Sequence, residues 1–177
     1  MITIKDLTVK NFMSVGNVTQ AVRFTDNGLT LVLGNNVDLG GDGSRNGTGK
    51  TTIINALSYA IYGNALTNIR KDNLINKTNG KSMMVTLDFV KDGTQYRIER
   101  GRRPNVLKYY VNEQNVDEDE AQGENRQTQT QIEKLFGMSH DMFKHIVALN
   151  TYTEPFLSMR ANDQRAIIEQ LLGITML

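Results

Sequence analysis

The sequence predicts an α/β fold in which a mixed sheet is accompanied by a second, antiparallel sheet. A short apolar run, residues 29–33, precedes a glycine-rich loop and an amphipathic helical pattern over residues 51–62. Two alternating segments, 83–90 and 94–100, flank a hairpin turn, and helical periodicity returns after residue 128. Strands combined with helices around one apolar core define the α/β class.

The composition is that of an ordinary globular domain. The chain has 177 residues, of which 39% are hydrophobic and 22% charged, and its net charge of +1 indicates no particular partner. The absence of cysteine excludes disulfides and cysteine-ligated metals and is consistent with a reducing cytoplasm. There is no signal-peptide pattern and no apolar run that could span a bilayer, so we expect a soluble, cytoplasmic protein without a membrane partner.

The first part of the chain is predicted to supply three strands. Residues 2–12 alternate between apolar and polar, with a slip near Asp6, and residues 18–24 are the expected antiparallel partner. Residues 29–33 are almost continuously apolar, which is typical of a strand buried on both faces.

The middle of the chain predicts one helix and one antiparallel sheet. Apolar residues recur at spacings of three and four over residues 51–62, and Gly63 is a suitable helix stop. Asp92-Gly93 favours a tight turn, so a hairpin is expected around it. The predicted strands of this sheet are 83–90, 94–100 and 106–111.

The last part of the chain is predicted to be helical. Residues 128–136 have a helical pattern that ends at Gly137. Ser139 is the expected N-cap of a following helix that runs through Val147, and Asn162 is the expected N-cap of a last one.

The glycine-rich loop carries the clearest chemical signal. Residues 46–52 read Asn-Gly-Thr-Gly-Lys-Thr-Thr and match the end of the phosphate-binding pattern Gly-x4-Gly-Lys-Ser/Thr. Ser44 stands where that pattern has its first glycine. Either Ser44 substitutes for the glycine directly, or Gly34 is the first glycine and residues 35–44 are an insertion. The predicted strand ends at Gly34, which favours the insertion, whose role the sequence leaves open.

These residues suit a nucleoside triphosphate. Glycines allow backbone N–H groups to surround phosphates at a helix N-terminus. Lys50 is expected to add a positive charge near the β- and γ-phosphates, and the Thr51 hydroxyl is expected to ligate magnesium. The cofactors predicted from the loop are therefore ATP and Mg²⁺.

Other functional patterns are incomplete. Residues 76–79 end in Asn79 where a guanine-reading motif needs aspartate, so adenine is favoured. Asp88 is the only candidate for a magnesium-holding aspartate at a strand end, but a hairpin follows it, and it reads as an ordinary sheet residue. No Leu-Ser-Gly-Gly signature exists, so no catalytic residue is predicted in this chain. A stand-alone small P-loop kinase and a non-catalytic nucleotide-binding module remain alternatives.

Basic residues are concentrated between residues 91 and 108. They could contact DNA phosphates without reading sequence, or they could form a solvated sheet face balanced by acidic residues 117–124. The four arginines concerned are Arg97, Arg100, Arg102 and Arg103. His140 and His145 lie off a common helical face without a carboxylate cluster, so no histidine metal site is predicted.

Several blocks of the sequence resemble the SMC-like ATPases, the relatives of bacterial SbcC. Residues 9–14 (Val-Lys-Asn-Phe-Met-Ser) resemble the N-terminal strand of that family. Residues 46–52 resemble its phosphate loop, and 93–100 its second-sheet hairpin. Residues 100–106 (Arg-Gly-Arg-Arg-Pro-Asn-Val) are especially similar to the ATPase subunit of T4-like phage recombination endonucleases. The segments that resemble the Q-loop and the start of the coiled coil are 143–149, 155–157 and 165–169.

The resemblance implies an ABC-type P-loop ATPase head, of which residues 1–177 are the N-terminal lobe, with a coiled-coil helix over 162–177. It implies four partners: the protein's own C-terminal lobe, a second head that shares two ATP molecules, a manganese-dependent nuclease subunit of the SbcD type, and DNA bound without sequence specificity. The implied task is double-strand-break processing and recombination. The signature and the water-activating glutamate belong to the C-terminal lobe, so this chain alone should be nearly inactive as an ATPase. Another SMC-type or RecF-like DNA ATPase is the alternative.

The resemblance also assigns individual roles. It places Ser14 near the nucleotide base, and it places Asn150 at the Q-loop position, where the family has a glutamine that ligates magnesium. Asparagine carries the same amide on a shorter stem, so the predicted metal ligands are Thr51 and Asn150. The predicted nucleotide-binding residues are Ser14, Gly34, Arg45, Asn46, Gly47, Thr48, Gly49, Lys50, Thr51 and Thr52.

Overall fold

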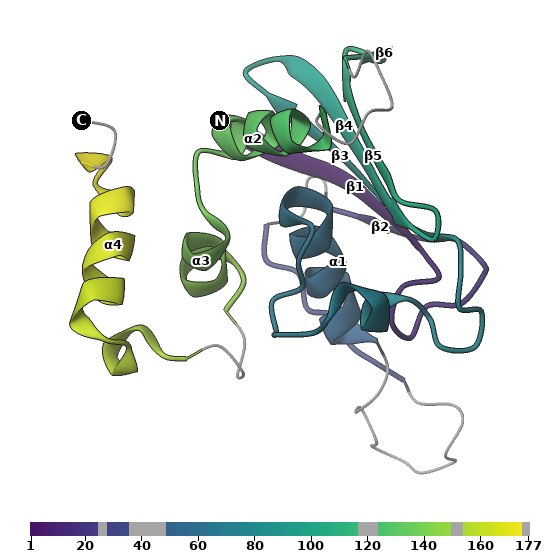
Figure 1. The fold of residues 1–177 in the computed structure, drawn as a ribbon, viewed down its shortest axis with the longest axis horizontal. Helices are drawn as coiled ribbons and strands as arrows, with labels where there is room; N and C mark the ends of the chain where they lie inside the picture. The colour runs from purple at the N-terminus through teal and green to yellow at the C-terminus, as the bar shows by residue number, and fades with distance from the viewer. Residues whose placement is uncertain (25–27, 36–48, 117–123, 150–153, 175–177) are drawn as a thin grey trace.

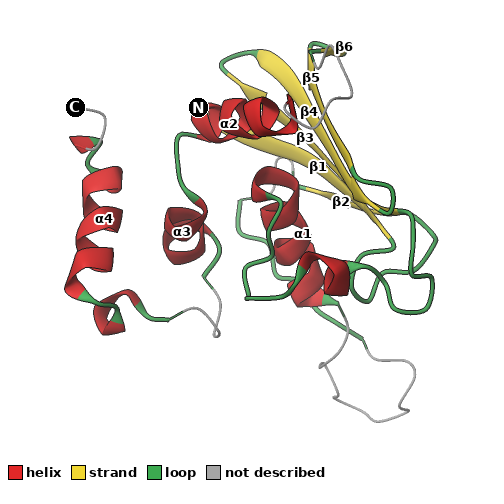
Figure 2. Ribbon diagram, in the orientation of Figure 1, coloured by secondary structure: helices red, strands yellow, loops and turns green. Residues whose placement is uncertain are grey.

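The computed structural model describes residues 1–24, 28–35, 49–116, 124–149 and 154–174. These residues form one sheet with the helices gathered on one side of it (Figure 1). Helix α4, Ala161–Leu171, packs against α3, His140–Met142, and lies farthest from the sheet (Figure 2). The predicted α/β class is confirmed. None of the helices in the described ranges is both long and apolar enough to cross a membrane.

A single antiparallel sheet of six strands organises the described residues. The strand order is β2-β1-β3-β4-β5-β6, and every pairing is antiparallel. The N-terminal hairpin therefore shares one sheet with the later strands, instead of belonging to a separate mixed sheet, because β1 pairs with β3 along its length. The strands are β1 Ile2–Lys10, β2 Gln20–Arg23, β3 Met83–Lys91, β4 Thr94–Arg102, β5 Val106–Val111 and β6 Gln114–Asn115.

Two local features of the sheet were predicted from the sequence. The slip near Asp6 is a β-bulge, since the register of β1 against β3 shifts between Ile4 and Asp6. The turn between β3 and β4 places Asp92 at φ 49° and Gly93 at φ 84°. Two successive left-handed residues form the tight turn that suits the twist of a hairpin.

The prediction for residues 29–33 is wrong. They form no strand, and Leu29, Leu31 and Leu33 are exposed. A strand buried on both faces needs a neighbour that pairs with its backbone, and no strand in the described part of the chain pairs with this segment. The apolar run is therefore an uncovered surface.

The helical elements follow the predicted order. In the described residues they are α1 Lys50–Tyr62, η1 Lys71–Leu74, α2 Glu124–Phe136, α3 His140–Met142, η2 Phe143–Val147, η3 Phe156–Ser158 and α4 Ala161–Leu171, with η2 a π-helical turn. Ser139 is the predicted cap of α3, and its hydroxyl accepts a hydrogen bond from the Met142 amide at 3.2 Å.

Asn162 is not the cap that the sequence predicted for α4. The N-cap position is Arg160, which makes no side-chain cap hydrogen bond, so Asn162 lies inside the first turn. Gln164 fixes the entry to the helix instead, because its side-chain amide donates to the carbonyls of Phe156 at 2.9 Å and Met159 at 3.1 Å.

The core lies between the sheet and helices α1 and α2. Ala56 and Ile61 of α1 are fully buried in the same apolar cluster as Leu7 of β1 and Leu87 of β3. Ile132 of α2 is fully buried in it as well. Met83 is buried in the same cluster, and half-buried Met138 packs against it, as suits a flexible side chain that fills gaps in a core.

Arg100 joins the sheet to the C-terminal end of α1. It lies on β4, is buried, and donates hydrogen bonds to the carbonyls of Ala60 at 3.0 Å and Ile61 at 3.4 Å. It also donates to the Gln129 side-chain oxygen on α2 at 2.6 Å. Desolvation lowers the pKa of Arg100 to about 10. A side chain in this position satisfies the last carbonyls of the helix, so Arg100 is a buried structural residue and does not belong to a solvated sheet face, one of the two interpretations that the sequence left open.

Replacing Arg100 should destabilise the fold strongly. We expect Arg100→Met to lower the free energy of unfolding by about 2–4 kcal/mol, because the α1 carbonyls and the Gln129 oxygen lose their buried donor. Arg97→Met is the matched control: Arg97 lies on the same strand in an exposed ion pair, and its loss should cost less than about 1 kcal/mol. Urea denaturation followed by circular dichroism measures both, and equal losses would show that Arg100 has no special structural role.

Candidate functional site

Helix α1 begins with an open N-terminus. Gly49 is its N-cap residue and has φ 83°, and no side chain among the described residues caps the helix. The first turn contains no acidic residue. The first amides of a helix have no partner within the helix, and the helix dipole adds partial positive charge there. The start of α1 is therefore prepared for an anion.

Ser14 lies against this helix start. Its hydroxyl is 3.1 Å from the Thr52 hydroxyl, and a Cβ atom added at Gly49 would be 3.4 Å from the Ser14 oxygen. Side chains predicted to bind the nucleotide from distant parts of the sequence are thus brought together. The left-handed backbone favours glycine at position 49.

A bend stabilised by asparagines positions Ser14. After β1 the chain turns through Asn11 and Met13, each at φ 50°. Asn76 donates from its side chain to the Met13 carbonyl at 3.0 Å, and Asn79 donates to the Asn11 side-chain oxygen at 2.8 Å. Asn76 and Asn79 thus use their side-chain amides to fix this bend.

A pocket of about 580 Å³ lies beside the start of α1. Lys50 and Thr51 line it together with apolar side chains of β2, of α1 and of the uncovered segment, such as Val22, Ile54 and Val32. Thr51 is exposed and Lys50 is half-buried. The start of α1 therefore adjoins an apolar hollow.

The predicted site is described only in part. The structure brings Ser14, Gly49 and Thr52 into contact, with Lys50 and Thr51 adjoining them at the start of α1. Gly34 is described and half-buried. Most of the predicted insertion, residues 36–44, lies outside the described residues, as do Arg45, Asn46, Gly47, Thr48 and Asn150.

The remaining arginines of the basic stretch differ in how closely their charges are paired with carboxylates. Arg97 pairs with Asp88 on the neighbouring strand at 2.6 Å, which confirms Asp88 as a sheet residue. Arg102 pairs with Asp72 at 2.7 Å, and Arg103 is 3.9 Å from the same carboxylate. These pairs favour the interpretation of a balanced sheet face for Arg97. Arg102 and Arg103 lie at the other end of β4, beside η1.

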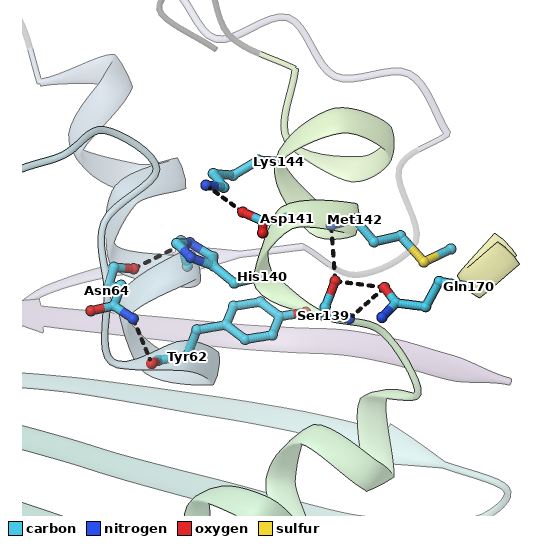
Figure 3. A network of polar contacts seen from close by, with 9 residues as sticks. Tyr62, Asn64, Ser139, His140, Asp141, Met142, Lys144 and Gln170 are labelled. Carbon is cyan, nitrogen blue, oxygen red and sulfur yellow. Dashed lines mark hydrogen bonds and ion pairs between the residues drawn. The ribbon is translucent and has the colours of Figure 1, made fainter. Parts of the chain in front are cut away.

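His140 has a structural environment. Its Nε2 is 2.9 Å from the Ser58 hydroxyl, and its ring packs on Tyr62 with ring centroids 5.0 Å apart. Burial, with a smaller contribution from Lys144, lowers the pKa of His140. Figure 3 shows His140 beside Tyr62, with Ser139 hydrogen-bonded to Gln170 of α4. In the described ranges no three side chains of the kinds that ligate metals cluster together.

An open helix start after a left-handed glycine, with lysine and threonine as its first residues, defines the chain as a P-loop nucleotide-binding protein. The sequence matches the AAA domain family over residues 6–175, and the chain belongs to this family. Its relatives identify it more closely as an N-terminal lobe of the SMC/Rad50-like ATPases, which confirms the predicted resemblance.

Two phage proteins are among the relatives. The chain is 34% identical over 167 residues to exonuclease subunit 2 of Enterobacteria phage T4 and 32% identical over 167 residues to exonuclease subunit 2 of Escherichia phage RB69. Each match covers 93% of this chain and 27% of the relative, so the chain spans about a quarter of their length. The DNA double-strand break repair Rad50 ATPase of Methanococcus maripaludis is 26% identical over 174 residues, which are 97% of this chain and 16% of that protein.

Solved structures confirm the fold. The Smc head domain of Pyrococcus furiosus, with an extended coiled coil and bound to the C-terminal domain of ScpA, matches 99% of this chain and 43% of its own with a TM-score of 0.66 at 21% identity. An SMC ATPase structure, from "Structural biochemistry of ATP-driven dimerization and DNA stimulated activation of SMC ATPases", matches 95% of this chain and 98% of its own with a TM-score of 0.61 at 20% identity. The described sheet and helices are therefore those of an SMC-type head lobe.

A side chain at position 49 should strain the helix start. We expect Gly49→Ala to lower the free energy of unfolding by about 1–2 kcal/mol, because alanine disfavours the positive φ of this position. Gly16→Ala is the control, since the added methyl group meets only the Asn79 side chain at 4.0 Å and should change stability by less than about 1 kcal/mol. Chemical denaturation compares the two, and a Gly49→Ala protein as stable as the wild type would contradict the described geometry.

The stability of the protein should fall below neutral pH through His140. The folded-state pKa of His140 is lowered, so the unfolded chain takes up the proton first. The contribution of neutral His140 is present above the unfolded-state value of about 6.5 and is lost as the pH falls through the folded-state value. Urea midpoints measured between pH 7.5 and pH 5.5 should drop more in the wild type than in His140→Asn. Parallel profiles would assign the pH dependence to other groups.

Proposed function

We propose that the chain binds ATP with Mg²⁺ at the start of α1 and serves as the N-terminal lobe of an ATPase head. The observation that carries this proposal is the uncapped start of α1, where Gly49 has a left-handed backbone and the Ser14 hydroxyl is hydrogen-bonded to that of Thr52. Backbone amides and a helix dipole directed at one point stabilise phosphate charge without a dedicated side chain.

The residues present fit both groups. The Lys50 ammonium would contact the phosphates, and the exposed Thr51 hydroxyl would ligate Mg²⁺, with Asn150 as the second protein ligand. Bound Mg²⁺ neutralises phosphate charge. The amides of the preceding loop would complete the anion site, with Ser14 beside the nucleotide. The loop residues in this proposal are Gly34, Arg45, Asn46, Gly47 and Thr48.

The exposed apolar residues 29–33 support the proposal that a second lobe covers this surface. Leu29, Leu31 and Leu33 are exposed next to the pocket that Lys50 and Thr51 line. Exposed apolar patches of this kind mark interaction surfaces, because their burial is favourable. A C-terminal lobe of the same protein is the proposed partner. The residues that activate water would come from that lobe.

The names of the relatives support a role in DNA metabolism. The phage relatives are exonuclease subunits, and the archaeal relative is a DNA double-strand break repair ATPase. We infer that the complete protein hydrolyses ATP, pairs with a second ATPase head, and works with an SbcD-type nuclease subunit on DNA without sequence specificity. The proposed task is double-strand-break processing and recombination in the cytoplasm.

Lys50→Ala should abolish most nucleotide binding. We expect the affinity for ATP with Mg²⁺ to fall at least about tenfold, because one charge-assisted contact to phosphate is lost. Lys81→Ala removes an exposed lysine outside the pocket beside α1 and should leave affinity unchanged. Equilibrium binding of a fluorescent ATP analogue measures the three proteins, and equal affinities would refute the site.

The wild-type, Lys50→Ala and Lys81→Ala proteins also test whether the chain contains only half of the catalytic site. Steady-state phosphate release should be near background for the chain alone, because the catalytic half is proposed to lie elsewhere. Rapid turnover by the chain alone that disappears in Lys50→Ala would refute the half-site and favour a self-sufficient enzyme.

A further inference from the structure

A polar cavity lies at the C-terminal end of α1, opposite the apolar pocket at its start. It has a volume of about 610 Å³ and is bounded by the last turn of α1, by η1, by the end of β4 and by α2. Its charged lining residues are Lys71, Arg100, Arg102 and Arg126, and no aspartate or glutamate lines it. A cavity whose charged groups all have one sign creates a strong local potential.

Lys71 and Arg100 approach one another at Gly63. A Cβ atom added at Gly63 would be 2.8 Å from an Arg100 guanidinium nitrogen and 3.7 Å from the Lys71 ammonium nitrogen. Both cations therefore reach the same small volume, which the glycine leaves open. Like charges this close repel unless an anion lies between them.

The cations at this cavity are incompletely neutralised. Asp72 pairs with Arg102 at 2.7 Å but stands outside the cavity and is about half exposed. Lys71 has no hydrogen-bond or ion-pair partner among the described residues. Desolvation and the charges of Arg100 and Arg102 lower the pKa of Lys71. Lys71 is exposed and Arg102 half-buried, so water screens part of this repulsion, and an anion that bridges the cations would relieve the rest.

We propose that this cavity is a binding site for a phosphate group, held by Lys71, Arg102 and Arg126 with Arg100 behind them. Arginine and lysine side chains together offer several donors to the oxygens of one phosphate. Helix α1 has 13 residues and separates this site from Gly49 by about 20 Å. One ATP bound at the start of α1 therefore cannot fill both sites. The phosphate is free or is carried by a nucleic acid backbone, and the two sources share this chemistry.

A structural explanation of the same charges makes the opposite prediction. The C-terminal end of a helix carries partial negative charge, which basic side chains can balance. Arg100 already occupies that position, since it donates to the Ala60 and Ile61 carbonyls. If the other cations served only the helix end, removing one would destabilise the protein. If they form a phosphate site, removing Lys71 relieves repulsion in the free protein and abolishes stabilisation by phosphate.

The test uses inorganic phosphate with the Lys50→Ala protein, so that the site at the start of α1 does not contribute. At constant ionic strength, phosphate should raise the melting temperature of Lys50→Ala. Adding Lys71→Met should remove that shift and weaken phosphate affinity by at least about tenfold in calorimetric titration. Adding Lys108→Met, which removes an exposed lysine on β5 outside the cavity, should leave the shift intact. An Arg126→Met protein should behave like Lys71→Met.

The outcomes separate this inference from the proposed function. No phosphate shift in Lys50→Ala, or an equal shift after Lys71→Met, overturns the phosphate site whatever Lys50 does to ATP binding. A lower melting temperature of Lys71→Met without phosphate also overturns it, in favour of the structural explanation. A short DNA duplex replaces phosphate in a second titration. Weaker duplex binding in Lys71→Met than in Lys108→Met assigns the site to backbone phosphates, and equal duplex binding assigns it to free phosphate.

Discussion

The contact between Arg100 and the end of α1 fixes the geometry on which the rest of the structure depends. Burying a guanidinium costs free energy, and the hydrogen bonds to Ala60, Ile61 and Gln129 offset that cost. These bonds are directional, so they set the position of α1 against β4 and its rotation about its own axis. Because a helix is stiff, fixing its last turn also fixes where its first turn lies.

The first turn is held by an independent set of polar contacts. The bend after β1 is closed by Asn76 and Asn79, and it presents Ser14 to Thr52. Contacts between apolar side chains tolerate small displacements of a helix, whereas the hydrogen bonds of side-chain amides require a defined position. Polar groups thus anchor both ends of α1 to the sheet, and the apolar residues between them provide most of the buried area. A phosphate-binding turn needs this accuracy, because its amides act only when they point at the same place.

The sequence predicted those parts of the fold that depend on local patterns. The bulge at Asp6, the Asp92-Gly93 turn and the Ser139 cap each follow from a few adjacent residues. The sequence could not predict the structural role of Arg100. An arginine on a strand is expected to be exposed unless a helix end is known to pack against it. The Lys50 motif was evident, but the contact of Ser14 with Thr52 joins residues 38 apart in sequence and was not predicted. The family resemblance placed Ser14 only near the nucleotide base.

The failure at residues 29–33 has a physical cause that bears on function. An apolar run indicates burial, but it does not say which chain provides the cover. Here the run stays exposed beside Lys50 and Thr51. Under the proposed function, the lobe that covers this segment also closes the pocket next to the phosphates. Excluding water there would strengthen the interactions of Lys50 with a bound nucleotide, because charges attract more strongly in a less polar medium. Burial of the apolar segment and completion of the nucleotide site would then be one coupled event.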